Sequence, residues 1–367
     1  MIYSKSHSLV NLANSMLKYF DQPCFHDSIP EIDDILNRSG RKKVALVLMD
    51  GLNEYIKSIH LDENDFLRKN AVLTIDSVFP PTTVAATTAI QTAKYPIESG
   101  WLGWSQHFKD LGITIDMFLN RISKTDQKCD HEISYEDYPY ETIAQIIDRK
   151  YRGTYVAPDH VKYGSAADLD DFYKQIDELL DQDEKQFIYA YWDQPDGLMH
   201  KYGVRADEVH EYIQMVNRRS EEMVKKHPDT LFLIIADHGL VDCEFIYFNE
   251  NKELYDTLKY MPYLDSRSLF VDIKDEYKDK FREMFYASYS RDDFDVLSKE
   301  EYLEQNYFGL GTPYPNIDNF LGDFLIVSKT EKMFVFKGYD GNYFRLVANH
   351  AGGMEEEFKI SVVIANN

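Results

Sequence analysis

Short apolar runs alternate with amphipathic segments along most of the chain. Residues 44–49 are nearly all apolar, as expected for a central parallel strand that is covered on both faces. Other runs that predict strands lie at 71–78, 154–157, 186–192 and 230–236. Segments that predict helices lie at 9–20, 140–149, 167–180 and 206–226. This alternation predicts an α/β protein, with a mostly parallel central sheet between two layers of helices in a three-layer α/β/α sandwich.

The pattern changes after residue 242, where the chain becomes rich in Tyr, Phe and charged residues. We predict strands at 268–273 and 294–297 with a helix at 277–285 between them. Strand character then returns at 324–328, 333–338 and 359–365. We therefore expect residues 1–242 and 323–367 to form the core domain, and residues 243–322 to form a small inserted α+β cap.

Composition and charge narrow the classes of ligand. Hydrophobic residues make up 44% of the 367 positions, which is ample for a large core, and the formal net charge is −23 at pH 7. An acidic surface repels nucleic-acid backbones and anionic lipid headgroups, so we expect neither a basic nucleic-acid-binding surface nor a membrane partner. A small phosphate-ester substrate would need a strongly positive local element, and bound cations are the natural candidates.

The cysteines and the N-terminal segment bear on the compartment. Cys24, Cys129 and Cys243 are far apart and odd in number, which predicts neither a disulfide framework nor a Cys-x-x-Cys metal knuckle. The first residues lack a continuous apolar stretch, and no segment approaches the roughly 18 apolar residues of a membrane span. We expect a soluble cytoplasmic protein.

Acids and histidines follow several of the predicted strands. Asp50 follows the strand at 44–49, and Asp237 and His238 follow the strand at 230–236. Asp196 and His200 lie four residues apart just after the strand at 186–192. Open α/β sheets place their ligands at such strand ends, and Asp and His are the donors that borderline metal ions accept.

Two further segments add to this set. Two prolines precede Thr82 and Thr83 in FPPTTVAATT, so one of these hydroxyls should lie at a helix N-terminus, where free N–H groups favour a phosphate oxygen. His350 lies in the glycine-containing segment NHAGG near the C-terminus. Each feature alone has a commoner explanation, such as a turn residue, a helix cap or a surface histidine. Jointly they are what two metal ions with mixed N and O ligands would require.

The ordered set resembles a known family. The order Asp-Gly, Pro-Thr-Thr, Asp-x-x-x-His, Asp-His-Gly and a late His resembles the alkaline phosphatase superfamily, specifically its type I phosphodiesterase/nucleotide pyrophosphatase branch. The likeness runs over nearly the whole chain. FPPTTVAATTAIQTAKYPIESGWLGW looks like the nucleophile helix of that branch, and NHAGGMEEEF looks like its late histidine loop. The resemblance implies an alkaline phosphatase-like fold.

The resemblance also implies a two-metal site, with zinc as the usual ion and manganese as the alternative. One ion would be held by Asp196, His200 and His350, and the other by Asp50, Asp237 and His238. Thr83 would be the nucleophile, also bound to the second ion, and would form a phosphothreonine. Thr83 is preferred over Thr82 because the family's spacing from the nucleophile to the Ala93, Tyr95 and Pro96 segment fits it.

One position departs from the family pattern. Many nucleotide pyrophosphatases carry a phosphate-contacting Asn shortly after the nucleophile helix, and the same spacing here falls at or beside Trp104 in GWLGW. Trp101 and Trp104 could stack on a nucleobase, although packing in the core is the commoner role of such residues. Because the phosphate-contacting Asn is missing, the phosphate contacts of those relatives, and the substrates inferred from them, do not transfer directly to this chain.

The leading functional hypothesis is hydrolysis of phosphodiester or nucleotide pyrophosphate bonds. Phosphomonoesterase, phosphonate hydrolase and phosphomutase activities remain alternatives on the same scaffold. The sulfatase branch is disfavoured because its Cys/Ser-x-Pro-x-Arg signature is missing around Thr83. An alternative of another class is a non-catalytic metal-containing module that binds phosphorylated ligands, although such a module has no need of the hydroxyl.

Overall fold

The central sheet of the protein has six strands and is mostly parallel. The computed structural model describes residues 3–338 and 341–366. The strand order is β2-β17-β8-β1-β7-β6. β1 pairs in parallel with both β7 and β8, whereas β17 runs antiparallel between β2 and β8. The six strands are β1 Lys43–Met49, β2 Ala71–Asp76, β6 Arg152–Val156, β7 Gln186–Trp192, β8 Thr230–Ile235 and β17 Lys359–Ala365.

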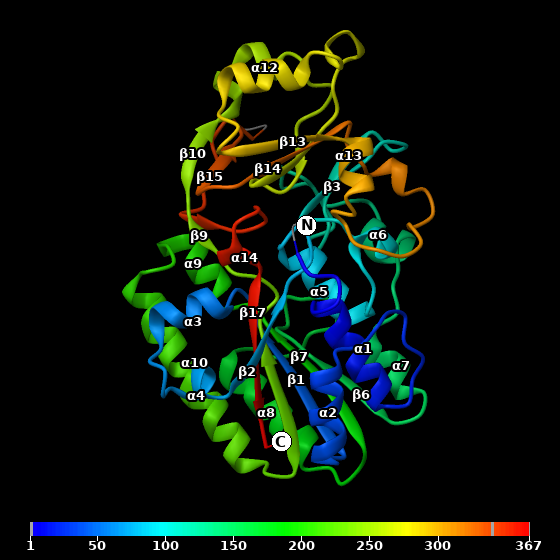
Figure 1. Cartoon of the computed structure of the whole chain (residues 1–367), viewed down its shortest axis with the longest axis vertical. Helices are drawn as coiled ribbons and strands as arrows, with labels where there is room; N and C mark the ends of the chain where they lie inside the picture. Colours follow the sequence, from blue (N-terminus) through cyan, green and yellow to red (C-terminus); the bar gives the residue numbers. More distant parts are fainter. Residues whose placement is uncertain (1–2, 339–340, 367) are drawn as a thin grey trace.

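Helices cover both faces of this sheet, because alternate residues of its central strands point to opposite sides. In β1, Leu46 and Leu48 pack into one hydrophobic core and Ala45 and Val47 into the other. Figure 1 shows the two helical layers on either side of the strands. The first layer contains α1 Leu9–Tyr19, α2 Pro30–Ser39, α5 Thr83–Thr92 and α7 Ile143–Asp148; the second contains α3 Glu54–His60, α4 Phe66–Lys69, α8 Leu169–Leu180, α9 Asp196–Tyr202 and α10 Asp207–Lys226. The predicted three-layer α/β/α fold is confirmed.

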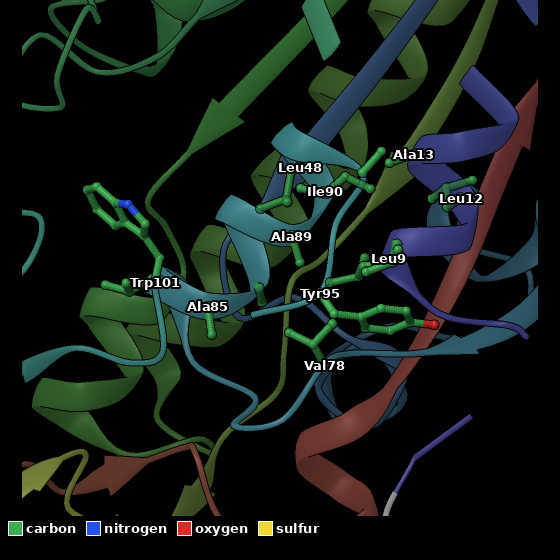
Figure 2. Close-up of a cluster of buried hydrophobic side chains, with 14 of the residues drawn as sticks. Leu9, Leu12, Ala13, Leu48, Val78, Ala85, Ala89, Ile90, Tyr95 and Trp101 are labelled. Carbon is green, nitrogen blue, oxygen red and sulfur yellow. The ribbon is translucent and has the colours of Figure 1, made fainter. Parts of the chain in front are cut away.

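Helix α5 is packed closely against α1. Figure 2 shows the small side chains Ala85 and Ala89 of α5 within the apolar cluster that also contains Leu9 and Leu12 of α1. All of these side chains are fully buried. Small residues allow the two helix backbones to approach, so α5 is held rigidly and its N-terminus has a fixed position.

A second sheet of seven strands lies beyond one end of the first (Figure 1). Its order is β13-β14-β12-β11-β3-β4-β5, and all its pairings are antiparallel. The strands are β3 Ser105–Phe108, β4 Ile113–Asp116, β5 Arg121–Ile122, β11 Tyr263–Leu264, β12 Ser268–Val271, β13 Phe294–Ser298 and β14 Phe324–Ser328. Helices α12 Phe281–Ser288 and α13 Lys299–Glu304 belong to the same region.

This sheet extends beyond the predicted cap at 243–322. That range supplies β11, β12 and β13, whereas β3, β4 and β5 come from before it and β14 from after it. Smaller pairings join the regions: β10 Glu244–Tyr247 pairs with β15 Lys332–Val335, and β9 Val241–Asp242 pairs with β16 Ala348–Asn349. The remaining short helices are α6 Pro96–Ser99, α11 Lys252–Tyr255 and α14 Glu355–Phe358. The cap therefore shares a sheet with segments assigned to the core.

Cys24, Cys129 and Cys243 are free thiols. No helix within the described ranges is both long enough and apolar enough to cross a bilayer.

The two tryptophans that follow α6 differ in environment. Trp101 is fully buried, donates a hydrogen bond from Nε1 to the carbonyl oxygen of Tyr138 at 3.0 Å, and packs against the rings of Phe118 and Tyr140. Trp104 is 36% exposed. Trp101 is therefore a core residue, and only Trp104 remains available for contact with a ligand.

Trp101→Ala is expected to lower the free energy of unfolding by about 3–5 kcal/mol, because it leaves a large cavity and an unpaired Tyr138 carbonyl. Trp104→Ala is the matched control and should cost about 1 kcal/mol or less, since its side chain is partly in solvent. Urea denaturation followed by circular dichroism measures both values. Equal losses of unfolding free energy in the two variants would contradict the assignment of Trp101 to the core and Trp104 to the surface.

Candidate active site

The sequence-predicted ligands meet at the carboxyl edge of the central sheet. Asp50 directly follows β1, Asp237 and His238 lie just beyond β8, and Asp196 begins α9 after β7. Because β1, β7 and β8 are adjacent and parallel, their ends bring these side chains together. Thr83 is the first residue of α5, which enters the site from one helical layer.

The first group of ligands surrounds His238. Its Nε2 lies 3.4 Å from Asp50 Oδ1, 3.4 Å from Asp237 Oδ2 and 3.1 Å from Thr83 Oγ1. Asp50, Asp237 and His238 offer atoms that all lie within 4.8 Å of one another, as a shared cation requires. All four side chains are buried. The hydroxyl of Thr83 thus lies at the edge of a candidate metal site.

The second group surrounds Asp196. His200 Nε2 lies 3.2 Å from Asp196 Oδ2, and His350 Nε2 lies 3.9 Å from Asp196 Oδ1. The rings of His238 and His350 have centroids 3.9 Å apart, so the two groups touch. A grouping by distance alone joins Asp196 and His350 with His238 rather than with His200. The six ligands and Thr83 therefore form one continuous cluster.

Each of the three carboxylates has one oxygen without a hydrogen-bond partner among the described residues, and in two of them the other oxygen is anchored. Asp50 Oδ2 accepts a 2.5 Å hydrogen bond from the Tyr191 hydroxyl, and Asp237 Oδ1 accepts from the backbone N–H groups of Gly51 and His238. Asp50 Oδ1, Asp237 Oδ2 and Asp196 Oδ1 are buried without a hydrogen-bond partner among the described residues. Unpaired buried carboxylate oxygens are costly. Their presence at the faces where the histidine nitrogens converge fits a divalent cation.

The pKa values reflect this crowding of buried charge. Burial raises the pKa of Asp50 well above its usual range, and the charges of Asp237 and Asp196 raise it further. Burial also raises the pKa of Asp237. Burial together with the charges of His238 and His200 lowers the pKa of His350 well below its usual range. A bound cation would relieve the repulsion among the carboxylates and favour neutral imidazoles.

His200 is fixed in one tautomer. Its Nδ1 lies 2.8 Å from the carbonyl oxygen of Ala348, which can only accept, so Nδ1 carries the proton. In the neutral ring Nε2 then presents a lone pair to the Asp196 carboxylate, and two acceptors face each other. Burial lowers the pKa of His200, but Asp196 and the Ala348 carbonyl raise it to about 9. Either a proton or a metal ion must lie between them, and a backbone bond at Nδ1 is the usual partner of a metal-binding histidine.

A buried ion pair holds the loop that carries His350. Arg267 and Glu357 are both fully buried and joined by two hydrogen bonds of 2.9 and 3.0 Å. Glu357 also accepts hydrogen bonds from the backbone N–H groups of Gly352 and Met354. The N–H group of Ala351 donates to the carbonyl oxygen of Pro81, just before Thr82 and Thr83. The second sheet, the His350 loop and α5 are thereby fixed relative to one another.

The geometry separates Thr83 from Thr82. Thr83 Oγ1 lies in the ligand cluster, whereas Thr82 Oγ1 donates a 2.9 Å hydrogen bond to Oδ2 of Asp265. Thr82 is the N-cap of α5, but its side chain makes no capping bond to the described backbone of the helix. The first N–H groups of α5 are therefore left for another acceptor, and a helix N-terminus favours an anion.

Sequence analysis missed four residues around the site. Tyr191 is in a buried strand that reads as core, and Asp265 is in a region without a recognisable motif. Arg267 and Glu357 are charged residues whose burial no local pattern indicates. For Glu357, the one signal in the sequence is that it ends a run of three acidic residues before Phe358. In the structure, Glu357 accepts a hydrogen bond from the N–H group of Met354 at the start of α14.

Solved structures share this fold. Murine ectonucleotide pyrophosphatase/phosphodiesterase 5 is 16% identical, with a TM-score of 0.66 and 88% of each chain covered. An inactive form of that protein in complex with AMP gives 16% identity, a TM-score of 0.62 and coverage of 88% of this chain and 87% of that one. Phosphonoacetate hydrolase from Sinorhizobium meliloti in complex with phosphonoformate is 15% identical, with a TM-score of 0.65 and coverage of 89% and 90%. No curated protein sequence matches significantly.

Fold and site together define a member of the alkaline phosphatase superfamily. Within it, the model of the type I phosphodiesterase/nucleotide pyrophosphatase family matches residues 44–351, which is most of the chain and includes all seven predicted site residues. The chain belongs to the type I phosphodiesterase/nucleotide pyrophosphatase family. It is therefore a hydrolase of the phosphodiesterase/pyrophosphatase type, in a family that depends on metals.

Proposed function

We propose that this protein hydrolyses phosphodiester or nucleotide pyrophosphate bonds of a small substrate, with Thr83 as the nucleophile. The observation that carries the proposal is the position of the Thr83 hydroxyl. It lies at the N-terminus of α5 and 3.1 Å from His238 Nε2, which is itself 3.4 Å from the unpaired oxygens of Asp50 and Asp237. A non-catalytic module would not need a hydroxyl there.

Charge balance favours two ions. The three predicted ligand carboxylates carry three negative charges, so one divalent ion would leave this set of ligands net negative and two would leave it net positive. No lysine or arginine forms an ion pair with the cluster within residues 3–338 and 341–366. A phosphate ester needs a positive site, and two ions would supply it in this acidic chain.

The donor set suits borderline metals such as Zn²⁺, with Mn²⁺ as the alternative, because nitrogen and oxygen ligands are mixed. Asp50, Asp237 and His238 would hold one ion together with Thr83. Asp196, His200 and His350 would hold the other. His238 lies against both groups, so it is the ligand that links the two positions.

The residues of the chain would act in two displacements. Bound divalent ions supply a lowered hydroxyl pKa, stabilisation of developing negative charge and activation of water. Thr83 Oγ1 attacks phosphorus, the P–O bond to the leaving alcohol or phosphate breaks, and the phosphoryl group on Thr83 keeps its other ester group. The free N–H groups of α5 are placed to donate to a non-bridging oxygen. Water then attacks phosphorus and releases the phosphomonoester and Thr83.

The nucleotide assignment within this proposal is supported by the similarity in fold to the murine protein solved with AMP. Of the two tryptophans after α6, Trp104 is the candidate for stacking on a base, because its side chain is partly exposed. Trp101 is buried in the core, so it is not a candidate for stacking on a base.

A phosphonate hydrolase is the second candidate. The phosphonoacetate hydrolase has a TM-score of 0.65 against this chain, close to the 0.66 of the murine protein, so fold similarity does not separate the two. The distinction depends on which substrates are cleaved.

Metal content and substrate preference test the proposal directly. The purified protein is expected to bind two divalent ions per chain, measured by inductively coupled plasma mass spectrometry. It should cleave bis-p-nitrophenyl phosphate with a kcat/KM at least about tenfold above that for p-nitrophenyl phosphate, which corresponds to about 1.4 kcal/mol of activation free energy. Chelation with EDTA should abolish activity, and Zn²⁺ or Mn²⁺ should restore it.

Three outcomes would contradict the proposal. Preferential release of phosphate from phosphonoacetate would favour the phosphonate hydrolase. Faster cleavage of the monoester would favour a phosphomonoesterase. Two bound ions without cleavage of any of these substrates would favour a binding module.

A further inference from the structure

A carboxylate from the second sheet lies beside the nucleophile segment. Asp265 follows β11 and accepts a 2.9 Å hydrogen bond from the Thr82 hydroxyl at Oδ2 and a 2.7 Å bond from the N–H group of Ser266 at Oδ1. Burial raises the pKa of Asp265 to about 6, while the two hydrogen bonds and the charges of His200 and His238 lower it. Asp265 therefore faces the candidate site, although it belongs to neither group of ligands.

The backbone around Asp265 is held on both sides. Leu264 pairs with Ser105 of β3 and Leu269 of β12. Leu264 also has a φ of +90°, a strained conformation for a branched residue that persists only where the surroundings enforce it. Arg267, two residues after Asp265, forms the buried ion pair with Glu357. Because this segment is held at both ends, the Asp265 carboxylate has a fixed position beside Thr82.

The bond from Thr82 has two consequences. It keeps the Thr82 hydroxyl from capping α5, so the N–H groups at the helix N-terminus stay available to a phosphoryl oxygen. It also holds the carboxylate within a hydrogen bond of the residue next to Thr83. A phosphoryl group attacked by Thr83 therefore lies close to this charge.

We propose that Asp265 determines specificity by disfavouring phosphoryl groups that carry two negative charges, so that the site selects monoanionic diesters over dianionic monoesters and carboxylated phosphonates. This inference rests on the proposed function and deepens it. A diester presents one negative charge to the α5 amides and the bound ions, whereas a monoester adds a second charge that Asp265 repels. The described residues offer no basic side chain in the cluster to offset that second charge.

Asp265→Asn tests this role with a change of charge and almost none of shape. The amide oxygen can still accept from the N–H group of Ser266, and the amide N–H can donate to the Thr82 hydroxyl. The ratio of kcat/KM for bis-p-nitrophenyl phosphate to that for p-nitrophenyl phosphate is expected to fall by about tenfold or more, chiefly because monoester cleavage rises. A merely structural role would lower both values together.

Asp295→Asn is the matched control. Asp295 lies in β13 of the same sheet and pairs with Lys329 on the surface, so the variant makes the same change in net charge away from the site. Its ratio should equal that of the unmodified protein. A ratio in Asp265→Asn within about twofold of the unmodified protein would overturn the inference.

A binding measurement separates this inference from the proposed function. In a Thr83→Ala background loaded with metal, Asp265→Asn should tighten binding of p-nitrophenyl phosphate by about tenfold relative to bis-p-nitrophenyl phosphate in isothermal titration calorimetry. Absence of diester cleavage by the unmodified protein would refute the proposed function, while this ratio of Kd values would still decide the role of Asp265. An unchanged ratio of Kd values would refute that role.

Discussion

Thr83→Ala is expected to lower kcat/KM for diesters on the order of 10⁴-fold or more while leaving two divalent ions bound. The hydroxyl is the only group of the cluster placed as a nucleophile, and it lies 3.1 Å from His238 Nε2. The six other ligands remain, so metal content should be retained. Steady-state kinetics and elemental analysis of the same preparation measure the two effects.

Thr83→Ser is the matched control, because it keeps the hydroxyl and removes only a methyl group. It should retain activity within about tenfold of the unmodified protein. Thr82→Val, which removes the neighbouring hydroxyl, should also turn over. Near-normal activity of Thr83→Ala, or inactivity of both Thr83 variants together with an inactive Thr82→Val, would refute the nucleophile assignment.

Asp237→Asn has the second largest expected effect, a loss of one bound ion per chain and a fall in kcat/KM of about 10²-fold or more. Oδ1 of Asp237 is occupied by two backbone N–H groups, so an amide in its place would turn its NH₂ group towards the ligand cluster. The free Oδ2, which lies 3.4 Å from His238 Nε2, is the atom lost. Elemental analysis against protein concentration gives the stoichiometry.

Asp193→Asn provides the comparison for this prediction. Asp193 lies three residues before Asp196 and bonds to His160, outside both groups of ligands. It should keep two ions. Retention of two ions by Asp237→Asn would contradict its role as a ligand, and loss of both would show that the division between the two groups is wrong.

The core fold was predictable because its strands are buried on both faces. The apolar runs at 44–49, 186–192 and 230–236 correspond closely to β1, β7 and β8, and their ends deliver Asp50, Asp196 and Asp237. In an open parallel sheet, the order of strands and the position of ligands follow from few rules. Boundaries were less exact: the helix predicted at 277–285 is α12 at Phe281–Ser288.

The second sheet was not predictable in full, because it is assembled from distant segments. β3, β4 and β5 are two to four residues long, and β3 joins them to β11, in which Leu264 pairs with Ser105. Short antiparallel strands carry little periodic signal, and their partners are set by tertiary packing. The same reason hides Asp265 and the Arg267–Glu357 pair, whose roles arise only when the two regions meet.

The site itself was predictable by residue type but not by distance. The order of six acids and histidines, together with the threonine after two prolines, predicted the seven residues that the fold brings together. It could not indicate that His238 lies against both groups of ligands, or that Tyr191 anchors Asp50. Those contacts depend on side chains that cross between strands and loops, and no local pattern specifies them.

In the proposed mechanism, Thr83 takes the phosphoryl group before water does. The most direct measurement is the stereochemical course of the reaction at phosphorus. A phosphorothioate diester of one configuration is hydrolysed in water labelled with a heavy oxygen isotope, and ³¹P NMR gives the configuration of the product. Each in-line displacement inverts the configuration, so two displacements through Thr83 predict net retention. Net inversion would show a single attack by water and would contradict the assignment of Thr83 as nucleophile.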